Sequence, residues 1–275
     1  MENVDFEINL PELGNFHMIV RYETESEAVP PSKDNMHIHD GIEFYVLEQG
    51  DTSFFVGGNL YDLTRADVIV TKPNEIHNCI RNSLCLHDYF CFWFSPACEV
   101  LLSDFLKHPE GKGNLIRLAQ TEKKELLSLC HKTFDQARDG KTVSACSAAI
   151  ALLELCRNGL YLFPEAKSMP KELIAVLQTI EEKMGSISSI NELCEQTFIS
   201  QSTLLRLFHR YLGVSPREYL EARRLAMARN YLNEGKSVTE AASLTGFSST
   251  SVFIRLFHRR FGVTPLKFRH INQSE

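Results

Sequence analysis

The feature that most constrains the fold of this chain is an internal repeat near its C-terminus. Residues 198–216 recur as residues 247–265, at an offset of 49 without gaps, and 11 of the 19 positions are identical. Similarity of that extent does not arise by chance. Two copies are too few for a solenoid, which needs about three or more stacked repeats. The repeat therefore indicates one small structural unit that is used twice.

Each copy has the pattern of a helix-turn-helix. In the second copy, Ala241 and Ala242 lie on a small apolar face that lets another helix approach closely, and a second helix is expected from Ser249 to Phe261. Between them, Gly246 suits a turn, because glycine adopts a left-handed backbone at the least cost. The first copy has Thr197 where the second has Gly246, which predicts a less tight first turn.

The second helix of each copy carries an unusual exposed face opposite its apolar one. This face combines small polar residues with one aliphatic residue and one arginine, namely Gln201, Ser202, Leu205 and Arg206 in the first copy and Thr250, Ser251, Ile254 and Arg255 in the second. Such a face suits the reading of DNA bases, since arginine binds guanine with two hydrogen bonds and an aliphatic side chain meets the thymine methyl group. Basic residues follow at the helix ends, where phosphates come within reach: His209, Arg210, His258 and Arg259.

The alternative interpretation is that Arg206 and Arg255 are ordinary surface charges. Their matched positions in both copies, within a basic region, favour base reading over that alternative.

The connector between the copies predicts how far apart the two reading helices lie. Capping boxes, in which a serine and the glutamate three residues later satisfy helix-terminal N–H groups, are expected at Ser189 with Glu192, Ser215 with Glu218 and Ser237 with Glu240. The second box opens a predicted helix from Ser215 to Asn233, about 28 Å long at 1.5 Å per residue. Successive major grooves on one side of DNA are about 34 Å apart, so this helix can place both readers on one face.

Charge separates the chain into two unlike parts. The net charge is −6, which alone argues against nucleic-acid binding. Residues 1–170 hold 15 basic and 25 acidic residues, a net of −10, whereas residues 171–275 hold 14 and 10, a net of +4. From Phe198 onward the balance is 12 against 5, a net of +7. The repeated region therefore has the local charge that DNA binding requires.

The front part is expected to be a β-barrel or sandwich followed by helices. Short apolar runs separated by turn signals predict strands at 16–22, 43–47, 53–56, 67–70 and 84–94. Helical periodicity follows at 98–106, 121–138 and 142–162. The last of these helices is apolar on most of its surface, so we expect both the barrel and a second subunit to cover it.

These patterns predict an α+β multidomain chain with four segments. They are a β-barrel at 1–97, a helical dimerisation segment at 98–163, a proline-bracketed linker at 164–170 and an all-α domain of two helix-turn-helix units at 171–275.

Composition bounds the cellular setting. No apolar run approaches the roughly 20 residues of a membrane span, and the acidic start lacks the pattern of a secretory signal. None of the eight cysteines forms a Cys-x-x-Cys pair, and most lie among apolar residues, so reduced buried thiols are expected. A cytoplasmic protein without membrane contact is the prediction.

On these residues, the chain resembles the AraC/XylS family of bacterial transcription regulators. The pattern over 238–269, Val-x-x-Ala-Ala-x-x-x-Gly-Phe-Ser-Ser followed by Phe-x-Arg-x-Phe and Gly-Val-Thr-Pro, is similar to that family's signature. The resemblance covers about Lys171 to His270. It implies two helix-turn-helix units that bind adjacent major grooves of promoter DNA, usually as a dimer, with the residues of both exposed faces as the contacts.

The front part resembles the cupin-like sensing domain of many such regulators. His37, His39 and Glu43 have the spacing of the first cupin motif, and His77 stands in for the second, four residues after Pro73 where five is more usual. In a metal cupin these four residues hold zinc, iron or manganese. In regulators of this family the same positions usually form an organic-effector pocket or a structural hydrogen-bond network, and both alternatives stay open.

Aromatic residues near these histidines would make such a pocket mostly apolar, if they are not simply core: Phe44, Tyr45, Phe54, Phe55 and Phe92. The histidines at 17, 87, 108 and 131 have no partner in the sequence, which favours core or surface roles.

The function expected from these features is that of a dimeric transcription activator that responds to a small molecule in the barrel and contacts RNA polymerase. It is not expected to be an enzyme, and no cofactor is expected beyond a divalent metal in the barrel. One alternative is a metal-dependent cupin enzyme or metal sensor fused to a DNA-binding domain. Another is a regulator whose barrel only dimerises.

Overall fold

The computed structural model describes residues 5–10, 16–33, 36–109, 111–162 and 169–273. Backbone contacts divide the chain into two compact units, which we call the N-terminal unit (residues 1–34 and 40–168) and the C-terminal unit (residues 35–39 and 169–275). Most of the predicted linker at 164–170 lies outside the described residues, so the four predicted segment boundaries stay predictions.

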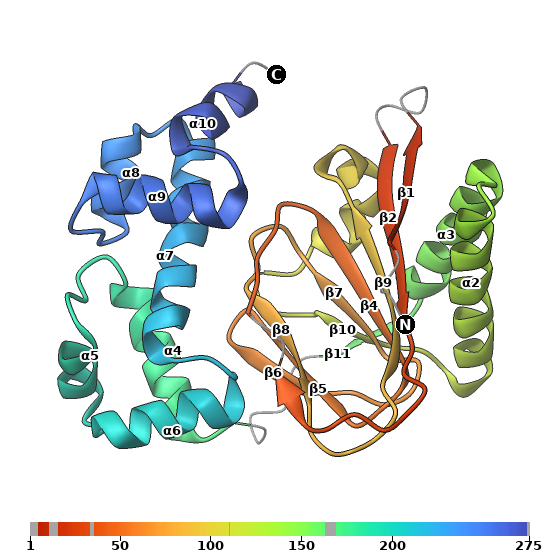
Figure 1. The fold of residues 1–275 in the computed structure, drawn as a ribbon, viewed down its shortest axis with the longest axis horizontal. Coiled ribbons are helices and arrows are strands. Elements are labelled where there is room, and N and C mark those ends of the chain that lie inside the picture. The colour runs from red at the N-terminus through yellow and green to blue at the C-terminus, as the bar shows by residue number, and fades with distance from the viewer. Residues whose placement is uncertain (1–4, 11–15, 34–35, 110, 163–168, 274–275) are drawn as a thin grey trace. The chain divides into compact units, whose positions relative to one another are not determined.

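Two antiparallel sheets form most of the N-terminal unit (Figure 1). The seven-stranded sheet has the order β1-β2-β9-β4-β7-β10-β11, and the four-stranded sheet has the order β3-β8-β5-β6. The strands are β1 (Asp5–Leu10), β2 (Phe16–Glu23), β3 (Ser32–Lys33), β4 (Ile42–Gln49), β5 (Thr52–Val56), β6 (Asn59–Asp62), β7 (Val68–Thr71), β8 (His77–Arg81), β9 (Asp88–Phe94), β10 (Leu115–Arg117) and β11 (Leu160–Leu162).

Strand β4 shows how alternation along a strand builds two cores. Phe44 and Val46 belong to the core shared with the helices that cover the outer face of the seven-stranded sheet. Tyr45 and Leu47 point the other way, into the core between the sheets, where they meet Phe54 of β5. Because side chains alternate across a strand, a single run of apolar residues serves both faces.

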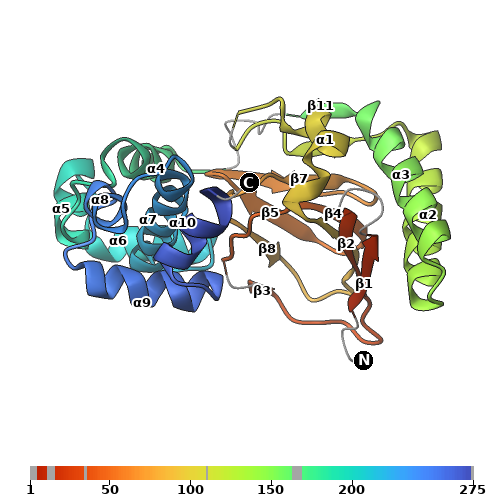
Figure 2. The same ribbon diagram turned by 90° about the horizontal axis from the view of Figure 1, so that it is seen from above.

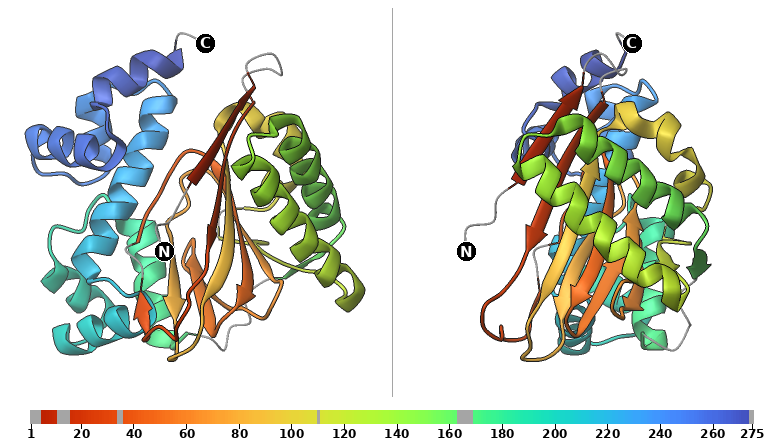
Figure 3. Two further views of the ribbon diagram at one scale, coloured as in Figure 1. Left: turned by 45° about the vertical axis from the view of Figure 1, so that its right-hand side comes forward. Right: turned by 90° about the vertical axis from the view of Figure 1, so that its right-hand side faces the viewer.

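The helices of this unit are α1 (Glu99–Leu102), α2 (Gln120–Arg138) and α3 (Thr142–Arg157). In Figure 3, α2 and α3 lie side by side over the outer face of the seven-stranded sheet. The prediction of a helix at 121–138 is confirmed. The predicted helix at 98–106 is instead one short turn of α-helix between two 3₁₀ turns.

The prediction that the third helix runs to residue 162 is wrong. Helix α3 ends at Arg157, and residues 160–162 form β11, which pairs with β10. The chain leaves the helix to pair with β10, and the approach is close, since a Cβ atom on Gly159 would lie 2.4 Å from the Ile116 side chain. Sequence periodicity cannot separate a short edge strand from the end of an apolar helix.

Residues 169–273 of the C-terminal unit fold into helices joined by short loops (Figure 2). Its helices are α4 (Lys171–Lys183), α5 (Ile190–Thr197), α6 (Gln201–Tyr211), α7 (Pro216–Asn233), α8 (Val238–Leu244), α9 (Thr250–Phe261) and α10 (Pro265–Gln273). Helix α7 contributes Leu225, Ala228 and Leu232 to a core with α8, α9 and α10. The two units together confirm the predicted class, a β-rich N-terminal domain followed by a helical C-terminal region.

Among the described helices, none combines the length and the apolar character that crossing a membrane would require.

Candidate functional site

Two helix-turn-helix elements lie in the C-terminal unit, α5 with α6 and α8 with α9. Serine side chains cap both second helices, since Ser200 Oγ accepts the N–H of Thr203 and Ser249 Oγ accepts that of Val252. In the second turn Gly246 has φ +77°, the left-handed backbone that was expected of this glycine.

The first turn differs from the second in where its left-handed residue lies. Thr197 stays in α5, and Phe198 takes the left-handed conformation with φ 55°. The caps Ser189 and Ser200 are 11 positions apart in the sequence, whereas the caps Ser237 and Ser249 are 12 positions apart. The stretch from one cap to the next is thus one residue shorter in the first helix-turn-helix. Its turn places a phenylalanine in the left-handed conformation, which costs more free energy than a glycine there would.

Two of the three predicted capping boxes are confirmed. Ser215 with Glu218 and Ser237 with Glu240 each satisfy both helix-terminal N–H groups. At Ser189 the box is incomplete, because the carboxylate of Glu192 accepts from the N–H and hydroxyl of Ser188 instead. The carboxylate of Glu192 therefore binds the residue before the N-cap, and not the N-cap residue itself.

The predicted reading faces are open to solvent. Leu205 and Ile254 are each 37% exposed, and Arg206 and Arg255 are exposed beside them. The remaining predicted contacts are also exposed, except Thr250, which is half-buried: Gln201, Ser202, His209, Arg210, Ser251, His258 and Arg259. Figure 1 shows α6 and α9 running in the same direction at opposite ends of α7.

Helix α7 and a set of close contacts fix the spacing of these faces. The helix has 18 residues, about 27 Å at 1.5 Å per residue. Arg224 on α7 donates to the carbonyl groups of Met184 and Ile187, which both follow the end of α4. A Cβ atom on Gly246 would lie only 2.7 Å from the carbonyl oxygen of Gly185. The turn of the second helix-turn-helix and helix α7 are therefore both packed against the loop that leads into the first helix-turn-helix.

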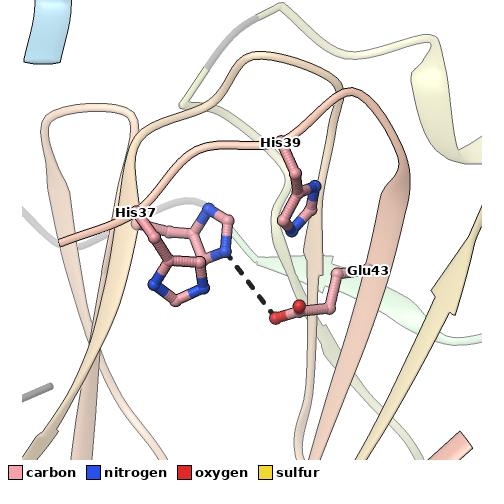
Figure 4. A group of neighbouring side chains, drawn as sticks. His37, His39 and Glu43 are labelled. Carbon is pink, nitrogen blue, oxygen red and sulfur yellow. Dashed lines mark ion pairs between the residues drawn. The ribbon is translucent and has the colours of Figure 1, made fainter. Parts of the chain in front are cut away.

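A second candidate site lies at four residues that the sequence singled out. His37, His39, Glu43 and His77 each offer one ligand atom, and these atoms all lie within 4.8 Å of one another (Figure 4). Glu43 and His77 are buried on β4 and β8, and the two other histidines are half-buried in the segment that leads into β4. The sequence therefore identified all four members of this cluster.

The ring of His77 is oriented for ligand binding. Its Nδ1 lies 2.8 Å from the carbonyl oxygen of Glu75, so Nδ1 donates and Nε2 keeps its lone pair. That Nε2 lies 3.7 Å from Oε1 of Glu43. A backbone carbonyl on the outer nitrogen is the usual partner of a metal-ligating histidine. Three imidazoles and one carboxylate fit a divalent transition metal, and they would supply its nitrogen and oxygen ligands.

Residues that the sequence did not single out support this ring. Glu75 is 1% exposed and accepts from Lys72 Nζ at 3.1 Å, from the N–H of Gly111 at 2.6 Å and from Asn114 Nδ2 at 2.6 Å. The loop before β10 is thereby fastened to the turn that carries His77. The sequence indicated only the Pro-Asn-Glu turn. The partners of Glu75 at Gly111 and Asn114 could not be predicted, because they come from a distant segment of the chain.

Of the candidate pocket aromatics, Phe44 and Phe92 do not line the barrel interior. Both belong to the core under the helices, whereas Tyr45 and Phe54 lie between the sheets. Phe55 is fully buried.

The other histidines have partners that the sequence could not show. His17 lies 3.0 Å from Glu7, and His131 lies 2.9 Å from Glu48. Nε2 of His87 lies 2.9 Å from the Tyr45 hydroxyl, and burial lowers the pKa of this histidine to about 4. The eight cysteines are all reduced thiols, and burial raises the pKa of Cys156 to about 12.

Comparison with known proteins agrees with this architecture. Residues 31–154 match the AraC-like ligand-binding domain, and residues 193–271 match a helix-turn-helix domain family. The regulator YbfI of Bacillus subtilis is 25% identical over 77% of this chain and 78% of its own length. The transcriptional activator RhaS of Salmonella heidelberg is 26% identical over 77% and 78%.

Solved structures with partial similarity include ToxT from Vibrio cholerae with a bound unsaturated fatty acid. It is 12% identical, with a TM-score of 0.39, over 94% of this chain and 96% of that one. The DNA-binding domain of AdpA in complex with a target DNA is 25% identical, with a TM-score of 0.35, over 36% and 90%.

A ligand-binding domain followed by two helix-turn-helix elements defines a transcription regulator. The chain belongs to the AraC family of transcription regulators.

Proposed function

We propose that this regulator binds promoter DNA as a homodimer, with α6 and α9 of each copy in successive major grooves. The observation that carries the proposal is the pair of matched exposed faces on two parallel helices separated by α7. Helix α7, about 27 Å long, is shorter than the roughly 34 Å between successive major grooves on one side of straight DNA. A modest bend of the duplex toward the protein closes that difference.

Within each face the residues divide by role. Arg206 and Arg255 are proposed to bind guanine, and Leu205 and Ile254 to contact thymine methyl groups. The base contacts are completed by polar residues at the starts of the same helices, namely Gln201, Ser202, Thr250 and Ser251. His209, Arg210, His258 and Arg259 are proposed to contact phosphates. Of these, Arg259 is already paired with Glu221 at 3.2 Å and would exchange that partner for phosphate.

Dimerisation is assigned to the helical segment of the N-terminal unit. Helix α3 exposes Val143 (77%) and Ile150 (48%) on one stripe, and Val100 nearby in the fold is 90% exposed. An apolar stripe of this kind is typical of a surface that a partner covers. The proposal has three further parts. The barrel binds a small-molecule effector, the protein activates transcription through RNA polymerase, and it acts in the bacterial cytoplasm.

The test is selection of bound duplexes from a random DNA pool by the full-length protein, repeated with a fragment of residues 170–275. The full chain should enrich a two-part sequence, and the fragment should bind it more weakly because the avidity of the dimer is lost. A fragment that binds no DNA even at low salt would contradict the assignment of DNA binding to this region.

A second candidate function, that of a metal sensor, rests on the cluster of His37, His39, Glu43 and His77. Four ligand atoms within 4.8 Å, with His77 oriented by a carbonyl, favour metal over a purely structural network. Metal analysis of the purified protein tests it, with His37→Ala and His39→Ala as variants. A stoichiometric metal that both variants lose supports the sensor. Metal-free protein that still binds its operator rules it out, along with a metal-dependent enzyme.

A further inference from the structure

A polar hollow of about 540 Å³ lies between the two helix-turn-helix elements, entirely within the C-terminal unit. We call it the serine–arginine groove. Residues from the α4–α5 loop, α7 and the start of α9 line it, including Ser188, Ser189, Arg217, Arg224, Ser248 and Val252. It is therefore built from both helix-turn-helix elements and from the helix that joins them.

Arg217 is the cation of this groove that is available to a ligand. It is exposed on the first turn of α7, and its guanidinium forms no hydrogen bond or ion pair within the described part of the chain. Arg224, by contrast, is held by the carbonyl groups of Met184 and Ile187. Glu221 also lines the groove, but its carboxylate is paired with Arg259 at 3.2 Å. The positive charge of Arg217 is therefore not neutralised by a carboxylate of the groove.

The groove borders α9, one of the two proposed reading helices. Val252 and Leu256 of α9 line it, and Val252 directly follows the predicted base contact Ser251. When two helices occupy successive major grooves on one side of a duplex, the minor groove and its two phosphate strands pass between them. In that arrangement an exposed cation beside α9, between the two helix-turn-helix elements, would meet the part of the DNA that carries charge but little sequence information.

We propose that Arg217 binds a backbone phosphate of the DNA where it passes between the two recognition helices. This inference rests on the proposed placement of α6 and α9 in successive major grooves. The guanidinium would form a charge-assisted hydrogen bond with a phosphodiester oxygen. Arg217 would thereby set the register of the protein on the duplex without reading bases, which distinguishes it from Arg206 and Arg255.

The experiment measures dissociation constants for two duplexes, one selected from a random pool and one of scrambled sequence, at several salt concentrations. Full-length wild type is compared with Arg217→Ala, Arg217→Lys and, as a matched control, Lys171→Ala. Lys171 is an exposed cation at the start of α4 that does not line the groove. Circular dichroism and thermal midpoints check that each variant is folded.

Arg217→Ala should weaken binding to both duplexes by a similar factor of about ten. It should also reduce the slope of log K against log salt by about 0.9, the value for one lost phosphate contact. Arg217→Lys should keep most of the slope, and Lys171→Ala should match wild type.

An unchanged slope with Arg217→Ala, or a loss confined to the selected duplex, overturns the phosphate assignment. Failure of the wild type to select any duplex would instead contradict the proposed function itself, so the two failures can be told apart.

Discussion

Glu43 on β4 and His77 on β8 lie in different sheets, yet 3.7 Å separates Oε1 of the carboxylate from Nε2 of the ring. Both residues are buried, and the second ring nitrogen of His77 is held by the carbonyl oxygen of Glu75 at 2.8 Å. A ligand that binds this pair touches both sheets at once. This pair thus forms a buried polar centre that joins the two sheets.

Loss of either member of this pair should strongly weaken metal binding. Glu43→Gln and His77→Ala each remove one of four donors, so the affinity for Co²⁺ or Zn²⁺ should fall at least tenfold to a hundredfold. Trp93 is the only tryptophan and pairs with Glu43 across β4 and β9, so its fluorescence reports binding in a titration. His131→Gln, outside the cluster, is the control. Metal binding that persists in His77→Ala would show that the ligand set is wrong.

Arginine truncation on the reading faces should relax sequence specificity. Arg206→Ala or Arg255→Ala should cost about 1–3 kcal/mol on the selected operator and much less on scrambled DNA, because the lost contact is to a base. Competition binding with operator variants measures both effects. Unchanged operator affinity would refute the assignment of these faces.

The turn glycine of the second helix-turn-helix should tolerate no side chain. In Gly246→Ala the new Cβ would lie 2.7 Å from the carbonyl oxygen of Gly185, in addition to the strain of φ +77°. Gly262→Ala has a similar φ of +72° but no atom within 4 Å of its Cβ, which makes it the matched control.

We expect a loss of about 1–2 kcal/mol in unfolding free energy for Gly262→Ala, from backbone strain alone. Gly246→Ala should lose about 1–3 kcal/mol more, because of the steric conflict. Urea unfolding of the two variants measures the difference, and equal losses would contradict the close packing of α8 against the α4–α5 loop.

The stability of the N-terminal unit should depend on His87 at mildly acidic pH. Burial lowers the pKa of His87 to about 4, below the ordinary value near 6.5, so the unfolded chain binds more protons between these pH values. The unfolding free energy should therefore fall as pH decreases from about 6.5 to 4, by up to about 1.4 kcal/mol per pH unit. Denaturant unfolding at several pH values tests this. His87→Gln should remove that part of the slope, whereas His108→Gln should not.

The sequence by itself determined the C-terminal architecture and the members of both candidate sites. A 49-residue repeat, serine caps and helical periodicity are local signals, so α6, α7 and α9 could be predicted close to their observed ends. The exposure of Arg206 and Arg255 followed from the same helical period. The cupin-like spacing likewise identified the four residues whose ligand atoms converge in the barrel.

Only the tertiary structure decided what depends on distant segments. The chain leaves α3 after Arg157 to pair β11 with β10, and the orientation of His77 follows from a turn that Gly111 and Asn114 hold in place. The division of β4 between two cores also required the pairing of whole sheets. Such contacts join residues far apart in the chain, and periodicity within a short window does not contain them.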